Sequence, residues 1–173
     1  MADLENGDFD RVIIVGNTAS GKSWLSDQMA SVLSAPIVRL DDVHWVNGDF
    51  TKRQNPDMAI AQIIDTSQMD RWIIEGVYGW LMSPIIEHAS CVVWIDVPWD
   101  TCQQNLLFRE QAQRGIVLSE ALERWAKEYW SRKTSSSYQG HLELFSAFGG
   151  PKFRLTSKRH VTNFVNDVVC TKH

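Results

Sequence analysis

The feature that most constrains this chain is a loop of eight residues, Gly-Asn-Thr-Ala-Ser-Gly-Lys-Ser, at positions 16–23. Its spacing, Gly-x-x-x-x-Gly-Lys-Ser, is the P-loop pattern, in which backbone N–H groups and a helix N-terminus surround the phosphates of a nucleotide. The lysine reaches the β- and γ-phosphates, and the serine hydroxyl binds Mg²⁺. The loop therefore predicts a nucleotide site for ATP and Mg²⁺.

The segments on either side of the loop support this prediction. Residues 12–15 form an apolar run typical of a buried parallel strand, and Leu25, Met29 and Leu33 follow at helical spacing. We expect two glycines of the loop to permit unusual φ angles and a close approach of phosphate. The residues predicted to bind the nucleotide are Gly16, Asn17, Thr18, Ala19, Ser20, Gly21, Lys22, Ser23 and Trp24.

Length and composition predict a single domain of an ordinary kind. The chain has 173 residues, of which 44% are hydrophobic, enough for one core. No apolar signal-peptide core or membrane-spanning run is present, so we expect a cytoplasmic protein without a membrane partner. Cys91, Cys102 and Cys170 form no Cys-x-x-Cys pair, which predicts reduced and mostly buried thiols.

The charge is distributed unevenly along the chain. The net charge is −4, but residues 1–100 carry 15 acidic and 6 basic side chains, and residues 101–173 carry 6 acidic and 11 basic ones. Such asymmetry suits a polyanionic ligand held between an N-terminal Mg²⁺ site and C-terminal arginines. Solvated helix faces explain a cluster of this kind equally well.

Apolar runs alternate with segments of helical periodicity, which predicts an α/β fold with a parallel sheet covered on both faces. The expected strands are residues 12–15, 36–40, 71–76, 91–96 and 152–156. Ligands bind at the carboxyl ends of such strands. The strand ends nominated in this way are Gly16, Asp41, Glu75, Asp96 and Thr156.

Several of these segments resemble the nucleoside-monophosphate-kinase-like group of P-loop proteins, and within it the small adenylate-kinase-related proteins known as DNA topology modulation or FlaR-like proteins. The segments that carry the resemblance are the P-loop, residues 40–45, 71–78 and 92–98, and a helix with Cys102 and Arg109. The resemblance implies a three-layer fold with strand order 2-3-1-4-5, a lid at about 99–133 and phosphoryl transfer from ATP. The chain departs from the usual pattern at Trp24, at Glu75-Gly-Val-Tyr78, and at Asn105, where the relatives have a second arginine.

Phosphoryl transfer depends on neutralising charge and on in-line placement, which nominates four catalytic residues: Lys22, Asp41, Arg109 and Arg114. Lys22 would neutralise phosphate charge, and Asp41 would orient the acceptor hydroxyl or take its proton. The guanidinium groups of the two arginines would bridge phosphates. The alternatives are a turn-forming acid at position 41 and solvated arginines at a helix end.

The remaining candidates surround the predicted acceptor. The residues predicted to bind the acceptor are Asp42, His44, Trp45, Glu75 and Tyr78. Ser23 and Glu75 are the predicted Mg²⁺ ligands, with acceptor binding left open as a second role for the glutamate. For Asp96 a structural role at the strand end is favoured over a metal-binding one. Lys158 and Arg159 are candidates to flank the adenine.

These residues support two hypotheses of different classes. The first is an ATP- and Mg²⁺-dependent kinase for a nucleotide-like or other small hydroxyl or phosphate acceptor. The second is a nucleic-acid partner, either a kinase acting on a base or an end in DNA or RNA or an NTP-binding regulator. A pI near 5.7 disfavours a broad phosphate-backbone surface, whereas the basic second half of the chain keeps the second hypothesis open.

Overall fold

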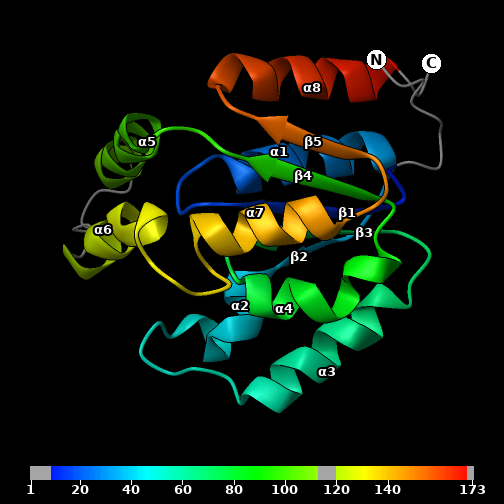
Figure 1. Ribbon diagram of the computed structural model, residues 1–173, viewed down its shortest axis with the longest axis horizontal. Helices are drawn as coiled ribbons and strands as arrows, with labels where there is room; N and C mark the ends of the chain where they lie inside the picture. Colours follow the sequence, from blue (N-terminus) through cyan, green and yellow to red (C-terminus); the bar gives the residue numbers. More distant parts are fainter. Residues whose placement is uncertain (1–8, 113–119, 171–173) are drawn as a thin grey trace.

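The computed structural model describes residues 9–112 and 120–170, and a parallel sheet lies at its centre (Figure 1). The strands are β1 (Arg11–Gly16), β2 (Ile37–Arg39), β3 (Trp72–Gly76), β4 (Cys91–Ile95) and β5 (Lys152–Leu155). They pair in the order β2-β3-β1-β4-β5, and every pair is parallel. The predicted α/β fold class and strand order are confirmed.

Helices cover both faces of this sheet, so the molecule has three layers (Figure 1). One face packs against α1 (Lys22–Leu33) and α8 (Lys158–Cys170). The other packs against α2 (Leu40–His44), α3 (Pro56–Ser67), α4 (Gly79–Met82) and α7 (Tyr138–Ala147). Short 3-10 turns lie at η1 (Val46–Gly48), η2 (Ser83–His88) and η3 (Glu128–Trp130). The helices α5 (Trp99–Ala112) and α6 (Glu120–Lys127) lie beyond the sheet, on the side to which the strands point.

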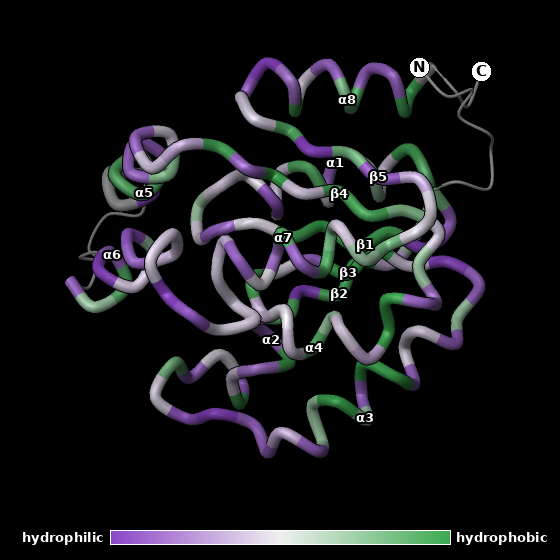
Figure 2. Tube along the Cα trace, in the orientation of Figure 1, coloured by the Kyte–Doolittle hydropathy of each residue, from purple (hydrophilic) through white to green (hydrophobic). Residues whose placement is uncertain are grey.

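Strand β1 shows why both layers are needed. Successive side chains of a strand point to opposite faces, so Val12 and Ile14 enter the core beneath α1 and α8, whereas Ile13 and Val15 enter the core beneath α3 and α7. All four are fully buried. Figure 2 shows the central strands in hydrophobic green and more hydrophilic colour along the outer helices. A continuous apolar run therefore specifies a central parallel strand here.

In the layer formed by α2, α3, α4 and α7, only α3 was predicted. The strand expected at 36–40 ends at Arg39, and Leu40 instead starts α2, because Leu40 and Val43, one helical turn apart, are both buried. Helix α7 begins in a polar stretch, residues 134–138, which in the sequence favours a loop that ends the preceding helix. Its N-cap is Ser137, whose hydroxyl accepts a hydrogen bond from the Gly140 amide at 3.2 Å.

Cys91 and Cys102 are buried free thiols, as expected, and Trp94 is fully buried. The helical spacing of Trp125, Tyr129 and Trp130 predicts that Trp130 lies on a core face, but its side chain is 37% exposed, because it stands at the end of η3. Arg114 and the side chain of Cys170 lie outside the described residues. Among the described helices, none combines the length and apolar character needed to cross a bilayer.

Candidate active site

The two P-loop glycines are required for different reasons. Gly21 has φ +107°, a left-handed conformation that glycine adopts without strain, and it leads directly into α1. At Gly16 a Cβ would lie 2.6 Å from the carbonyl oxygen of Ile95 on β4, so the strand pairing itself excludes a side chain. The expectation of an unusual φ angle is thus confirmed at Gly21, while Gly16 is required by a neighbouring strand.

Lys22 lies inside this loop, and its side chain is buried. Its ammonium group donates a hydrogen bond of 2.7 Å to the carbonyl oxygen of Asn17. Burial lowers the pKa of Lys22, and the carboxylates of Glu75 and Asp41 oppose that shift. Because both carboxylates act on one buried ammonium group, the ends of β1, β2 and β3 converge on Lys22.

The predicted metal ligands lie in contact with each other. The Ser23 hydroxyl donates a hydrogen bond of 2.8 Å to Glu75 Oε1, and Glu75 is only 5% exposed. Arg39, whose guanidinium also pairs with Asp27, lies 3.8 Å from the same carboxylate oxygen. This pair of oxygen-bearing side chains is a donor set suited to Mg²⁺.

A second cluster lies around Asp41, which the fold places in the first turn of α2. The Tyr78 hydroxyl donates to Asp41 Oδ1 at 3.0 Å and accepts from Trp45 Nε1 at 3.0 Å. The His44 ring stacks on Tyr78 with centroids 4.3 Å apart. Burial and the neighbouring Asp41 raise the pKa of Tyr78, so its hydroxyl stays a proton donor. Four of the predicted acceptor-side residues thus form one cluster.

Burial and the charge of Arg53 lower the pKa of His44. The ring is therefore a neutral aromatic surface at neutral pH. Asp42 is exposed one position further along α2, and no hydrogen bond or ion pair joins it to another described residue. Adjacent residues of a helix point in different directions, which separates Asp42 from the cluster around its neighbour.

Asp96 lies apart from both clusters. Its carboxylate accepts hydrogen bonds from Arg154 Nε at 2.8 Å and Nη2 at 2.5 Å, and Arg154 also packs over the Trp94 ring. This ion pair links the ends of β4 and β5. The contacts favour the structural role for Asp96. Lys158 and Arg159 are exposed at the start of α8, and Trp24 is 48% exposed on α1.

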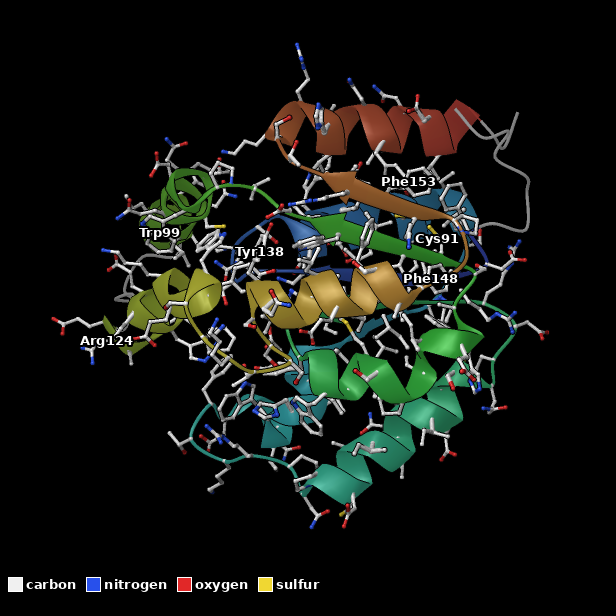
Figure 3. All side chains as sticks on the ribbon, in the orientation of Figure 1. Cys91, Trp99, Arg124, Tyr138, Phe148 and Phe153 are labelled. Carbon is white, nitrogen blue, oxygen red and sulfur yellow. The ribbon has the colours of Figure 1, made fainter. Side chains whose placement is uncertain are left out.

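The helices of the predicted lid are tied to the P-loop by two asparagines. Asn17 Nδ2 donates to the carbonyl oxygen of Ala126 in α6, and Asn105 Nδ2 in α5 donates to that of Ala19, each at 2.8 Å. Trp99 packs beside these contacts, between α5 and α6 (Figure 3). Asn105, which stands where the resembling proteins carry arginine, therefore fastens α5 to the loop.

Arg109 is exposed on α5, and its positive charge adds to the lowering of the Lys22 pKa. It is thus close enough to act electrostatically on the phosphate-binding loop. Arg114, its predicted companion, lies outside the described residues. The lid role of residues 99–133 stays a prediction.

The P-loop contains a polar atom that is without a protein partner. Among the described residues, Ser20 Oγ is the one fully buried side-chain oxygen or nitrogen that makes no hydrogen bond. An unpaired buried hydroxyl is costly. A phosphate oxygen would satisfy it, so the loop fits the triphosphate of ATP, and Ser23 with Glu75 fits Mg²⁺. No group of three or more His, Cys, Asp or Glu side chains forms a metal site within the described ranges.

A separate pocket lies away from this chemistry. It has a volume of about 590 Å³ and lies between η2, α7 and residues 133–135, with Ser83, Lys133 and Glu143 among its lining residues. None of its lining residues belongs to the P-loop or to the cluster around Asp41. The candidate active site is therefore identified by its side chains and not by the volume of a cavity.

Comparison with known proteins identifies the fold. No family model matches the sequence, and no curated protein matches it. Solved structures do: a gluconokinase from Sinorhizobium meliloti 1021 has a TM-score of 0.58 at 11% identity, covering 94% of this chain and 90% of that one. The chain shares its fold with this protein.

Two further structures support this assignment. A shikimate kinase from Acinetobacter baumannii, in complex with shikimate, has a TM-score of 0.61 at 10% identity and covers 93% of this chain and 91% of that one. A shikimate kinase from Bacteroides thetaiotaomicron has a TM-score of 0.57 at 12% identity, with coverage of 91% and 95%. Identities this low show the fold and leave the substrate open. The narrower resemblance to DNA topology modulation proteins stays a prediction.

Proposed function

We propose that this chain is an ATP- and Mg²⁺-dependent phosphotransferase that moves the γ-phosphate to a small hydroxyl or phosphate acceptor, including nucleotide-like ones. The observation that carries the proposal is the convergence on Lys22. Its buried ammonium group interacts electrostatically with the carboxylates of Glu75 and Asp41. Glu75 is hydrogen-bonded to Ser23, and Asp41 is hydrogen-bonded to Tyr78. ATP bound with Mg²⁺ at Glu75 and an acceptor bound at Asp41 would therefore both lie next to the Lys22 ammonium group.

Each residue has a role that follows from its contacts. Lys22 would exchange the Asn17 carbonyl for phosphate oxygens and stabilise the charge that spreads over them during transfer. Ser23 and Glu75 would hold Mg²⁺, which when bound supplies further neutralisation of phosphate charge. Asp41, oriented by the Tyr78 hydroxyl, would align the acceptor hydroxyl or accept its proton. Arg109 on α5 would approach the phosphates as part of a lid.

The first test is a screen of ATP consumption over candidate acceptors. Nucleosides, nucleoside monophosphates, sugars and shikimate would be compared, the last because two structurally similar proteins are shikimate kinases. We expect one acceptor class to stimulate ADP formation, and a phosphorylated product to appear by mass spectrometry. The stimulation should require Mg²⁺ and should be absent from a variant that lacks Lys22. ADP formation that no acceptor stimulates, without a phosphorylated product, would contradict the proposal.

A nucleic-acid acceptor is the second candidate, and one observation favours it. Phe50 is 70% exposed beside Trp45, and the Arg53 guanidinium lies 5.7 Å from the centre of the Trp45 ring. Aromatic rings and arginine together bind single-stranded bases. Titration of single-stranded and duplex DNA at two salt concentrations tests this candidate, with Phe50→Ala as the matched variant. Binding that is absent at low salt would exclude it.

A further inference from the structure

A buried relay of hydrogen bonds connects four segments of the molecule. Trp94 Nε1 donates to the Tyr129 hydroxyl at 3.3 Å, that hydroxyl lies 2.7 Å from His141 Nδ1, and His141 Nε2 lies 2.9 Å from the carbonyl oxygen of Val77. Trp94 and His141 are fully buried, and Tyr129 is 1% exposed. The relay thus joins β4, η3, α7 and the segment that follows β3.

Only one assignment of protons satisfies every atom in this relay. A carbonyl oxygen only accepts, so His141 Nε2 carries the hydrogen that is donated to Val77. Burial lowers the pKa of His141 to about 3, so the ring is neutral and Nδ1 accepts from the Tyr129 hydroxyl. The indole N–H only donates, so the Tyr129 oxygen accepts from Trp94. A network in which all members are satisfied specifies a single geometry.

Both ends of the relay lead to the candidate active site. Val77 precedes Tyr78, whose hydroxyl holds Asp41 at 3.0 Å. Tyr129 comes shortly after Ala126, whose carbonyl oxygen accepts from Asn17 of the P-loop. The positive charge of Lys22 adds to the lowering of the His141 pKa, so the two side chains lie within electrostatic range of each other. The α6–η3 segment and α7 therefore bridge the phosphate-binding loop and the predicted acceptor carboxylate.

We propose that Tyr129 and His141 are positioning residues, which fix the backbone at Val77 and thereby hold Tyr78 and Asp41 in place relative to the P-loop. The expected effect of these residues on turnover rests on the proposed kinase function. A purely packing role would not need these residue types, because apolar groups of matching shape in place of both partners are close to neutral for stability. The relay instead fixes a direction for the Val77 carbonyl.

The test compares two Tyr→Phe variants. Tyr129→Phe removes the hydroxyl that both Trp94 and His141 contact. Tyr138→Phe removes a hydroxyl on α7 whose one hydrogen-bond partner among the described residues is Arg154, outside the relay. Tyr138 lies at the start of α7 (Figure 3). With an acceptor from the screen, we expect Tyr129→Phe to lower kcat/KM for the acceptor roughly 10- to 100-fold, since small misplacements of a reacting group have effects of this size. The KM for ATP should stay the same, and Tyr138→Phe should match the parent in both constants.

A double variant shows whether Tyr129 acts through Tyr78. If it does, Tyr78→Phe combined with Tyr129→Phe is no slower than Tyr78→Phe alone, because coupled residues are not additive. Additive losses, or equal losses in the constants for ATP and acceptor, would overturn the positioning role.

A readout without turnover separates this inference from the kinase proposal. The Trp45 indole N–H donates to the Tyr78 hydroxyl, so its signal in a ¹H–¹⁵N NMR spectrum reports the placement of Tyr78. We expect this signal to shift in Tyr129→Phe and to stay in place in Tyr138→Phe. An unmoved signal in Tyr129→Phe would overturn the inference even if the chain is a kinase, and a shifted signal would sustain it even if no acceptor is found.

Two substitutions of His141 give the same test if Tyr129→Phe does not fold. His141→Gln places an amide N–H near the position of Nε2 and keeps the donor to Val77, whereas His141→Asn reaches only the position of Nδ1 and loses it. We expect the Trp45 signal and the acceptor constants to change less in the first variant, which loses only the Tyr129 contact, than in the second, which loses the donor to Val77. The reverse order, or equal effects, would contradict the role assigned to the Val77 contact.

Discussion

The phosphate-binding loop and the region around Asp41 are built in different ways. The loop is eight consecutive residues, shaped by the left-handed conformation of Gly21 and by the close pairing of Gly16 with β4. The Asp41 region joins Asp41, Trp45 and Tyr78 through side-chain hydrogen bonds between separate segments, with His141 behind them. Local backbone geometry thus forms one half of the site, and contacts between distant residues form the other.

The largest expected effect is in the loop. Lys22→Ala should lower phosphoryl transfer by about 10³-fold or more, because it removes the cation that meets the developing phosphate charge. The thermal unfolding midpoint should not fall. Burial disfavours the charged form of Lys22, as its lowered pKa indicates, and the substitution removes that cost. Turnover and calorimetry check this pair of expectations. A folded variant with full activity would contradict the kinase function.

Asp41→Asn tests the other half. The amide keeps the size of the side chain but cannot accept the acceptor's proton, so kcat should fall by about 10²- to 10⁴-fold with little change in ATP affinity. Steady-state kinetics with both substrates, together with equilibrium binding of ATP, measures the two effects separately. If the loss occurs in ATP binding alone, Asp41 belongs with Glu75 at the metal site.

The buried His141 predicts a dependence of stability on pH. Its pKa is lowered to about 3 in the folded chain, whereas the unfolded imidazole binds a proton below its ordinary pKa of 6.5. The contribution of the neutral ring to the free energy of unfolding is complete above pH 6.5 and is lost as the pH drops toward 3. The loss is roughly 3 kcal/mol at pH 4 and about 5 kcal/mol below pH 3.

Denaturant unfolding between pH 7 and pH 4 measures this effect, and His141→Gln is the control because it lacks the titrating ring. The free energy of unfolding of the parent should drop more steeply than that of the variant over this range. The lowered pKa of His44 acts in the same direction in both proteins and cancels in the comparison. Parallel curves would mean that His141 is not held neutral.

A glycine substitution sharpens the contrast in backbone geometry. Gly16→Ala should destabilise the fold by about 1–3 kcal/mol, because a Cβ would lie 2.6 Å from the carbonyl oxygen of Ile95 and the strands must shift. Gly149→Ala is the control, since a Cβ there has open space. Chemical denaturation of both variants checks the difference, and equal stability would show that β1 and β4 are less closely paired at this point.

The smallest effect is expected outside both regions. Asp96→Asn should lower stability by only about 0.5–1 kcal/mol, because its partner Arg154 is 41% exposed and solvent screens the pair. Turnover should stay the same if Asp96 has the structural role at the strand end that its contacts with Arg154 favour. Kinetics of the purified variant checks this, and a specific loss of Mg²⁺-dependent activity would return Asp96 to the metal site.

Much of the architecture could be predicted because its signals are local. The buried apolar runs identified the strands, and strand ends nominated Glu75 and Asp41, both of which act on Lys22 in the structure. The short helix α2 was missed because the buried Leu40 directly follows the partly buried strand β2 and has the appearance of its last residue. Its helical packing becomes evident only from Val43, which is buried one turn later. Helix α7 was missed because its polar start conceals a serine cap.

His141 and Tyr129 could not be nominated from the sequence. A single histidine between polar and apolar residues has no partner in its own segment, and its two contacts lie 12 and 64 positions away. Asn105 gave a signal only as a departure from the resembling proteins, and its contact with the loop depends on how α5 packs. Pairings of this kind form only after the layers have packed.

By itself, the sequence determined the P-loop and the parallel sheet, and it nominated Lys22 for phosphate and Ser23 and Glu75 for Mg²⁺. Hydrophobic periodicity and glycine geometry act over a few residues, so they can be recognised in the chain before it folds. The tertiary structure decided that Ser23 bonds to Glu75, that Tyr78 holds Asp41, and that His141 and Tyr129 lie behind them. Those contacts depend on the register of separate strands and on the packing of helices, which no local pattern encodes.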